Sequence, residues 1–366
     1  MNFPALPPVV TRILKTLGLC VALLAAGPLG AQTIRGVLVD ERDAPVPGAL
    51  MVLVYPGGQS QAGAITDARG RFRLVAALPG RYTVRAERTG YRTVETQVEL
   101  GAGQTANVRL VTGIQAFVLP AVEAVGETPC TVRPGRGLAA YTLWDEARKA
   151  LQSTAFLQDA RRLEYTVRTY RSEIGMSAGR RRRQLDEPRR VTGRPFSTLT
   201  PAELASGGYV RIGGDSIGYY GPDAQSLLSD EFLDNHCLYV DADAGDARTV
   251  ALAFEPIRRR GITDIRGVLR MNRRTGELRE VEYQYTDLPG DLRGSPAGGL
   301  VEFQRLTNGA WAVVRWRIRS TGVMRGTDWE RRGRETHVIS DIREAGGEVT
   351  EILLVQDPQN TDDETR

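Results

Sequence analysis

Two stretches of the chain alternate apolar and polar residues with a period of two, the pattern of β-strands that bury one face. Between residues 33 and 111 the runs are short and are separated by turns that contain proline and glycine, which indicates a sandwich of about seven strands. Two of these runs supply candidates for its core. Each run places three apolar residues on one face of a strand: Leu50, Val52 and Val54 in the first, and Tyr82, Val84 and Ala86 in the second.

Between the two stretches the period changes to that of a helix. The apolar positions at helical spacing are Trp144, Ala147, Leu151 and Ala155. Thr142, followed by Asp145, fits the start of a capped helix. The sequence therefore predicts one helix over residues 142–159, whose apolar stripe packs against a sheet rather than against a partner protein.

From residue 161 to about residue 355 the period of two returns. It is clearest where Val314, Trp316 and Ile318 alternate with three arginines, because such a strand has one apolar face and one charged face. The dipeptide Asn308-Gly309 lies between two of these runs and predicts a tight hairpin. We predict a curved antiparallel sheet with the helix laid across it.

The fold class expected from these patterns is mainly β, with an N-terminal seven-stranded β-sandwich followed by a helix and a curved antiparallel sheet. Arg12 and Lys15 precede a short apolar run that ends in small residues at Ala31, the pattern of a cleaved signal peptide. The expected segments are a signal peptide at 1–31, the sandwich at 32–112, a linker at 113–140, an antiparallel β domain with its packing helix (142–159) at 141–356, and a disordered tail at 357–366. Export to the periplasm or the outer membrane follows as an expectation.

The order of turn residues between positions 36 and 91 resembles the carboxypeptidase regulatory-like domain, a transthyretin-like sandwich. The resemblance is carried by Gly36 to Asp40, Ala44-Pro45-Val46-Pro47-Gly48, Thr66-Asp67, Gly70 to Phe72, Leu78-Pro79-Gly80 and Gly90-Tyr91. It implies a folding aid, a spacer or an interaction module, and the wider fold group includes carbohydrate-binding domains.

The resemblance does not imply peptidase activity here. A carboxypeptidase zinc site is built from histidines and a glutamate, whereas this chain has two histidines, His236 and His337, without His-x-x-Glu spacing. A second resemblance covers residues 238–285, whose turns are similar to those of half-barrel proteins related to outer-membrane lipoprotein carriers. It implies a sheet face that could hold an acyl chain or a protein segment.

Composition adds limits rather than an activity. Charged residues at 25% and hydrophobic residues at 41% are typical of a globular protein, and the net charge of +4 gives no case for nucleic acid as a partner. Outside the expected leader the chain has two cysteines, Cys130 and Cys237, which we expect to form a disulfide in an oxidising compartment. Two buried thiols are the alternative. We expect no cofactor, no metal and no transmembrane helix in the mature chain.

Two short motifs carry candidate chemistry. The segment Gly214-Asp-Ser216-Ile-Gly218 matches the Gly-x-Ser-x-Gly nucleophile motif, with His236 or His337 as a base, but its antiparallel surroundings favour a turn between strands. The acidic run at 241–246 resembles the start of a calcium loop. It lacks an acidic residue at the fifth position and a glutamate at the twelfth, so we expect a solvated hairpin loop.

A dense positive run, Arg180-Arg181-Arg182-Arg183, is continued by Arg189 and Arg190. We expect a solvated loop between strands, with contact to anionic lipid head groups or phosphate-bearing glycans as the functional alternative. Four aromatic residues could stack on sugar rings, although aromatic residues in strands belong more often to the core. They are Tyr219, Tyr220, Trp311 and Trp316.

These observations predict a non-catalytic, exported binding or scaffolding protein of the cell envelope, with carbohydrate as the expected ligand class. An envelope glycan or a membrane-associated protein is the expected partner. The alternative is a lipid- or lipoprotein-handling role for the second domain, and a serine hydrolase acting through Ser216 comes third. A hydrophobic cavity would favour lipid, and an exposed aromatic platform would favour sugar.

Overall fold

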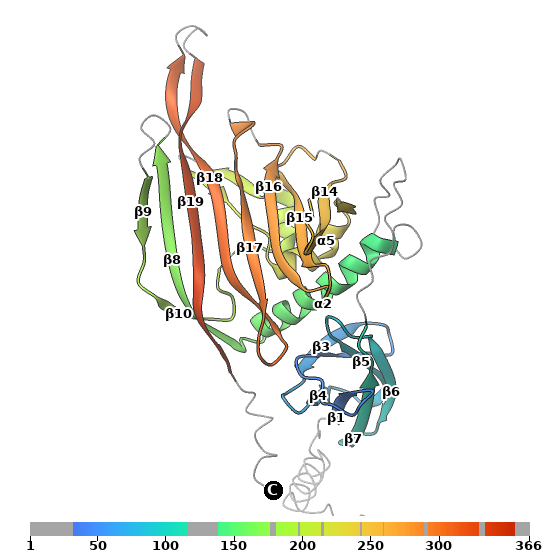
Figure 1. Ribbon diagram of the computed structural model, residues 1–366. Coiled ribbons are helices and arrows are strands. Elements are labelled where there is room, and N and C mark those ends of the chain that lie inside the picture. The colour runs from blue at the N-terminus through green and yellow to red at the C-terminus, as the bar shows by residue number, and fades with distance from the viewer. Residues whose placement is uncertain are drawn as a thin grey trace, which may run out of the picture.

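The computed structural model describes residues 32–115, 138–175, 181–196, 198–213, 216–241, 244–258, 260–288, 292–328 and 334–355. The expected signal peptide, most of the expected linker and the expected C-terminal tail lie outside these ranges. Within them the chain is mainly β, with two N-terminal sheets, one long helix and a large antiparallel sheet, as predicted (Figure 1).

Seven strands form the N-terminal sandwich. They are β1 (Gln32–Asp40), β2 (Leu50–Val54), β3 (Ser60–Ile65), β4 (Arg71–Ala76), β5 (Gly80–Glu87), β6 (Val94–Leu100) and β7 (Thr105–Thr112). One sheet has the order β4-β1-β7 and the other the order β3-β2-β5-β6. Tyr82, Val84 and Ala86 of β5 lie in the core between the sheets, which confirms the prediction for this strand.

Strand β2 is buried on both faces, and the predicted orientation of its side chains was wrong. Met51 and Leu53 belong to the sandwich core. Leu50 and Val52, predicted for that core, face the other way and are 2% and 7% exposed. Together with residues of helix α2 (Leu138–Asp159) they line a small cavity between sandwich and helix. The alternation along β2 did not identify the core face, because helix α2 covers the face of the strand that would otherwise be exposed to solvent.

Helix α2 begins earlier than predicted. Residues 138–140 are helical, although we assigned them to the linker. Thr142 does not cap the helix, because its hydroxyl donates to the carbonyl oxygen of Leu138 at 2.8 Å inside the first turn. Ala147 and Leu151 are fully buried against the large sheet, as the apolar stripe predicted. No helix of the described residues combines the length and the apolar run needed to cross a bilayer.

The rest of the chain builds a ten-stranded antiparallel sheet. Its strands are β8 (Leu163–Gly175), β9 (Arg181–Leu185), β10 (Arg189–Thr192), β13 (His236–Asp241), β14 (Thr249–Pro256), β15 (Asp264–Asn272), β16 (Leu278–Thr286), β17 (Gly298–Arg305), β18 (Trp311–Asp328) and β19 (Arg334–Leu354). The order is β10-β8-β19-β18-β17-β16-β15-β14-β13, and β9 also pairs with β8. Between β10 and β13 lie short elements: α3 (Pro201–Gly207), the hairpin of β11 (Val210–Gly213) and β12 (Ser216–Tyr219), α4 (Ala224–Leu228) and α5 (Asp230–Leu233).

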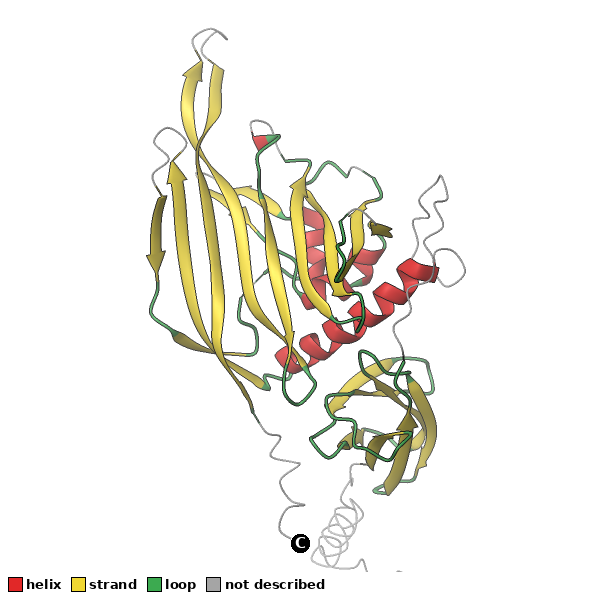
Figure 2. Ribbon diagram, viewed as in Figure 1, coloured by secondary structure: helices red, strands yellow, loops and turns green. Residues whose placement is uncertain are grey.

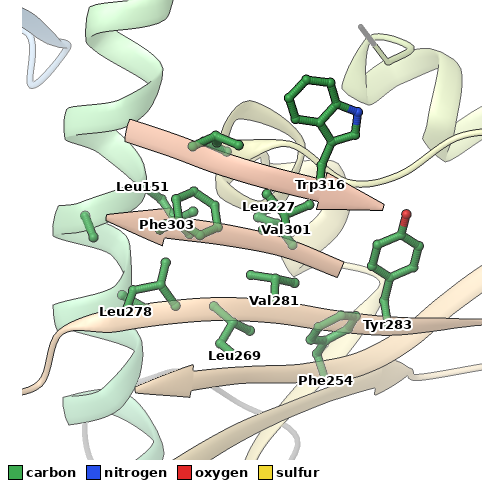
Figure 3. Packing of buried hydrophobic residues seen from close by; sticks show 14 of the residues in the cluster. Leu151, Leu227, Phe254, Leu269, Leu278, Val281, Tyr283, Val301, Phe303 and Trp316 are labelled. Atoms are coloured by element: carbon green, nitrogen blue, oxygen red, sulfur yellow. The ribbon is translucent and has the colours of Figure 1, made fainter. Parts of the chain in front are cut away.

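The helices cover one face of the large sheet (Figure 2). Figure 3 shows Leu151 of α2 and Leu227 of α4 among the side chains of the sheet, including Val281 and Val301, and all four belong to one hydrophobic cluster. Side chains alternate along a strand, so the opposite face of the same strands carries the polar residues. Any ligand site on that face lies outside the hydrophobic core.

Two glycine turns bring the sandwich against the large sheet. Asn308-Gly309 lies in the hairpin between β17 and β18, as predicted, and the Gly309 N–H donates to the carbonyl oxygen of Leu306 at 2.9 Å. A Cβ on Gly48 would lie 2.5 Å from the carbonyl oxygen of Asn308, and one on Gly309 would lie 2.6 Å from that of Pro47. Backbone therefore meets backbone at this contact, with no room for a side chain.

A cluster of buried charges joins α2 to the sandwich. Lys149 Nζ lies 2.7 Å from Glu146 Oε1, and these two residues are 3% and 4% exposed. The other carboxylate oxygen of Glu146 accepts the N–H of Gly90 at 2.8 Å, in the turn between β5 and β6. Arg148 donates to the buried carboxylate of Glu87 at 2.9 Å. Because buried charges need partners, these contacts hold the sandwich in one position on the helix.

Candidate functional site

A groove of about 1400 Å³ opens at one end of the large sheet. Its walls come from described residues of two connections, 257–258 and 261–263 between β14 and β15, and 287–288 and 293–297 between β16 and β17. Antiparallel pairing places both connections at the same end of the sheet. Its floor is formed by residues of the strands β14 to β18. The groove is therefore a product of strand pairing and loop length, not of one sequence motif.

The floor follows one row of paired residues across the sheet. Arg266 pairs with Gln284, Gln284 with Gly298, and Gly298 with Arg319. A Cβ on Gly298 would collide with the carbonyl group of Tyr283, so glycine is needed for the strands to approach here. The same glycine leaves the middle of the row without a side chain, and polar groups of Gln284 and Arg319 flank the gap.

Positive charge exceeds negative charge in the lining. The arginines are Arg258, Arg266, Arg293, Arg317 and Arg319, and the carboxylates are Glu255, Glu282 and Asp287. Glu282 is already paired, because Arg270 contacts its Oε2 at 2.9 Å. Arg258 and Arg293 are exposed and form no ion pair with a described residue. The groove therefore favours an anionic or strongly polar ligand.

Several hydroxyl groups also line the groove. Tyr283 is 2% exposed, and burial raises the pKa of its phenol, so the group stays a hydrogen-bond donor. The hydroxyls of Thr286 and Ser295 are buried and make no hydrogen bond with a described residue, whereas the side chain of Tyr283 lies in the hydrophobic cluster on the opposite face of the sheet. Because these hydroxyls are closed to solvent, the groups that can bind a ligand are the exposed side chains of the floor and walls.

A buried charge network anchors one wall of the groove. The carboxylate of Asp264, which begins β15, accepts from Arg260 Nη2 at 2.5 Å and lies 3.1 Å from His236 Nε2. His236 Nδ1 lies 2.9 Å from the carbonyl oxygen of Phe232. Both ring nitrogens thus face acceptor oxygens. The wall loop is fixed to the sheet through these contacts.

This network predicts acid sensitivity. Burial by itself would raise the pKa of Asp264, but hydrogen bonding to His236 and the charges of His236 and Arg260 outweigh it and lower the pKa below its usual 3.8. The stability from this carboxylate is therefore present above pH 3.8 and is lost as the pH falls through the folded-state value. Urea unfolding between pH 6 and pH 3 should show the gap between the wild type and Asp264→Asn closing toward low pH. A gap independent of pH would contradict the assignment.

The structure does not place Ser216 in a nucleophile elbow. Ser216 opens β12 opposite Gly213 in a two-stranded antiparallel hairpin, whereas the motif requires a strand that turns into a helix against a parallel sheet. Residues 214–215 of the motif lie outside the described residues. His236 is held in the buried network beside Asp264, and the side chain of His337 is outside the described part.

The described part of the acidic run, Asp241 and residues 244–246, lies where β13 is connected to β14, and residues 242–243 lie outside the described residues. Asp241 Oδ1 accepts the N–H of Ala244 at 3.0 Å, and Asp246 Oδ1 accepts those of Arg248 and Thr249 at 2.7 Å. These carboxylates stabilise the turn itself. Among the residues that the structure describes, no group of three His, Cys, Asp or Glu side chains could hold a metal ion.

The arginine run was wrongly predicted as a loop. Residues 181–185 form the edge strand β9, paired with β8, and residues 189–192 form β10. Arg183 lies over the ring of Tyr170, with 4.7 Å between its Cζ and the ring centroid. Arg180 is outside the described residues. These arginines lie at the opposite edge of the sheet from β13 and are not part of the groove.

The aromatic residues considered for sugar stacking belong to the core side of the sheet. Trp311 and Trp316 are 3% and 8% exposed, and Tyr219 and Tyr220 pack against the same cluster. Sequence analysis missed the groove itself. The alternation of arginines with apolar residues around Arg317 and Arg319 indicated one charged face of a strand. It did not indicate which residues of the neighbouring strands lie on the same face.

Cys237 is disulfide-bonded and 2% exposed. Its expected partner, Cys130, lies outside the described residues, so this pairing stays a prediction. Loss of the bond in Cys237→Ser should lower the free energy of unfolding by about 2–4 kcal/mol. Peptide mapping without reduction should recover one peptide that links positions 130 and 237, and two alkylated thiols in the native protein would refute the pairing.

The chain is similar to several solved structures at low identity. A hydroxyquinol 1,2-dioxygenase from Pseudomonas putida is 11% identical over 25% of this chain and 59% of its own, with a TM-score of 0.20. A minor pilin from Streptococcus agalactiae is 21% identical over 26% and 48%, also with a TM-score of 0.20. A candidate carbohydrate binding protein from Bacteroides uniformis is 12% identical over 71% and 97%, with a TM-score of 0.22.

This chain thus spans less than two thirds of the length of the dioxygenase and the pilin. No curated protein matches it. The family model of the carboxypeptidase regulatory-like domain matches residues 33–112, which confirms for that part of the chain the family that its turn residues predicted.

Proposed function

We propose that the protein is an exported, non-catalytic binding protein of the cell envelope, and that its groove holds a carbohydrate. The observation that carries this proposal is the groove at the end of the large sheet, whose lining combines arginines, carboxylates and the exposed side-chain amide of Gln284. Sugar rings present many hydroxyl groups and match such a lining. The leader pattern of residues 1–31 supports export.

In this proposal the sandwich at 32–112 presents and stabilises the binding domain at 141–356. The buried pair of Glu146 and Lys149, with the glycine contact at Gly48, supports a fixed arrangement of the two rather than a flexible tether. A fixed spacer would hold the groove at a set distance and orientation from the envelope. This role agrees with an interaction module that has no chemistry of its own.

The lipid-handling alternative needs an apolar sheet face that is free to hold an acyl chain. Helix α2 and the helix α4 pack on the apolar face of the large sheet, and side chains such as Leu151 and Phe303 are buried there. An acyl chain on the opposite face would meet Arg317 and Glu282. These contacts favour the polar groove as the ligand site.

Binding to a glycan array tests the proposal. We expect the purified protein to retain one class of glycan and to release it unchanged after long incubation, because Ser216 opens an antiparallel hairpin and not a nucleophile elbow. The variant Ser216→Ala should bind equally. Turnover of a bound glycan or ester that stops in Ser216→Ala would contradict the non-catalytic assignment, and the absence of any glycan binding would contradict the ligand class.

A further inference from the structure

We propose that the ligand of the groove is an acidic glycan, whose carboxylate or phosphate groups are bound by arginines of the two wall loops. This inference rests on the proposed function and narrows its ligand class. It is carried by the position of Arg258 in one wall and Arg293 in the other, both exposed and without an ion pair to a described residue. No described residue occupies the donors of either guanidinium through an ion pair, so these donors can bind a ligand.

The floor of the groove adds donors of the same kind. Arg317 and Arg319 share a single carboxylate, that of Glu344, at 3.9 Å and 3.6 Å. These separations exceed hydrogen-bond length, so contact with Glu344 leaves the N–H groups of both arginines able to bind an anion. Arginine binds carboxylate and phosphate through two parallel hydrogen bonds, and it does so best where a site is partly shielded from water.

The same face argues against an acidic peptide as the ligand. An extended peptide gains affinity by adding a strand to a free sheet edge. Strands β15 to β18 at the groove are paired on both sides, so no edge is available there. The side-chain amide of Gln284, exposed on the floor between the arginines, can instead hydrogen-bond the hydroxyl groups of sugar units.

The test compares charged and neutral polymers on the wild type and on the double variant Arg258→Gln/Arg293→Gln. The probes are oligogalacturonate for carboxylate, a phosphomannan for phosphate, neutral dextran and poly-L-glutamate. Both arginines are exposed and form no ion pair with a described residue, so the double variant should keep the wild-type melting temperature. Arg69→Gln is the matched control, because Arg69 is an exposed arginine of the sandwich whose side chain forms no ion pair with a described residue.

We expect one of the two acidic glycans to bind, with an affinity that falls as salt is raised, and we expect the double variant to weaken it by about tenfold or more. Arg69→Gln should bind as the wild type does. Dextran bound equally by the wild type and the double variant would overturn the anionic ligand and leave the proposed function standing. No binding of any glycan would overturn both, and tighter binding of poly-L-glutamate would overturn the glycan in favour of a peptide.

Discussion

Replacing Lys149 by methionine is expected to lower the free energy of unfolding by about 3–5 kcal/mol, the usual cost of removing one partner of a buried ion pair. The ammonium group lies 2.7 Å from Glu146 and 3.0 Å from Asp145. Burial by itself would lower the pKa of Lys149, but the two carboxylates raise it above its usual value, so the group is charged. Its loss leaves the buried carboxylate of Glu146 without a counter-charge.

A second substitution separates charge from packing. In Glu146→Gln/Lys149→Met both charges are absent, while the glutamine can still accept the N–H of Gly90 through its amide oxygen. We expect the double variant to recover most of the lost stability, because removing a whole buried pair costs far less than removing half of it. Arg109→Met, which breaks the exposed pair with Asp43, should cost less than about 1 kcal/mol. Equal losses in Lys149→Met and Arg109→Met, measured by urea unfolding, would contradict the account.

The second large effect is expected at the glycine contact between sandwich and sheet. Gly48 has a φ of +74°, and an added Cβ would lie 2.5 Å from the carbonyl oxygen of Asn308. Gly48→Ala therefore combines a strained backbone with a collision, and we expect a loss of about 2–4 kcal/mol. Gly58→Ala is the matched control, because Gly58 has a φ of +82° but nothing within 4 Å of the added atom.

The control should lose about 1 kcal/mol, the cost of the left-handed conformation alone. The difference between the two variants measures the contact between the two halves of the chain. Chemical denaturation followed by tryptophan fluorescence reports this difference well, because Trp311 lies in the core of the large sheet near the contacted hairpin. Equal losses in both variants would mean that the sandwich and the sheet are not packed at Gly48.

The sequence predicted the elements better than their contacts. Turn residues such as Gly48 and Gly309 indicated two tight turns, and both turns are present. Nothing in either local pattern showed that these turns meet, because they are distant in sequence and carry no side chains. For the same reason the burial of Leu50 and Val52 was assigned to the wrong partner: alternation shows that a face is apolar, not which element covers it.

The groove likewise could not be predicted from local sequence patterns. The alternation of charged and apolar residues around Arg317 could be recognised in the sequence. Which residues of the neighbouring strands lie beside Arg317 depends on strand register, and a shift of one residue would move their side chains to the other face of the sheet. Arg258 and Arg293 lie in connections without a periodic pattern, and only the pairing of β14 to β17 brings those connections to one end of the sheet. The Gly-x-Ser-x-Gly match at Ser216 shows the converse, since its strand and helix context is absent.

The central claim is that the ligand binds in the groove of the large sheet and not on the sandwich. Hydrogen–deuterium exchange of the full protein with and without its bound glycan tests this directly. We predict slower exchange at the backbone amides of Gly261 to Ile265 and Ser295 to Gly299, with no change in β1 to β7. Protection confined to the sandwich, with the amides beside the groove unchanged, would contradict the claim.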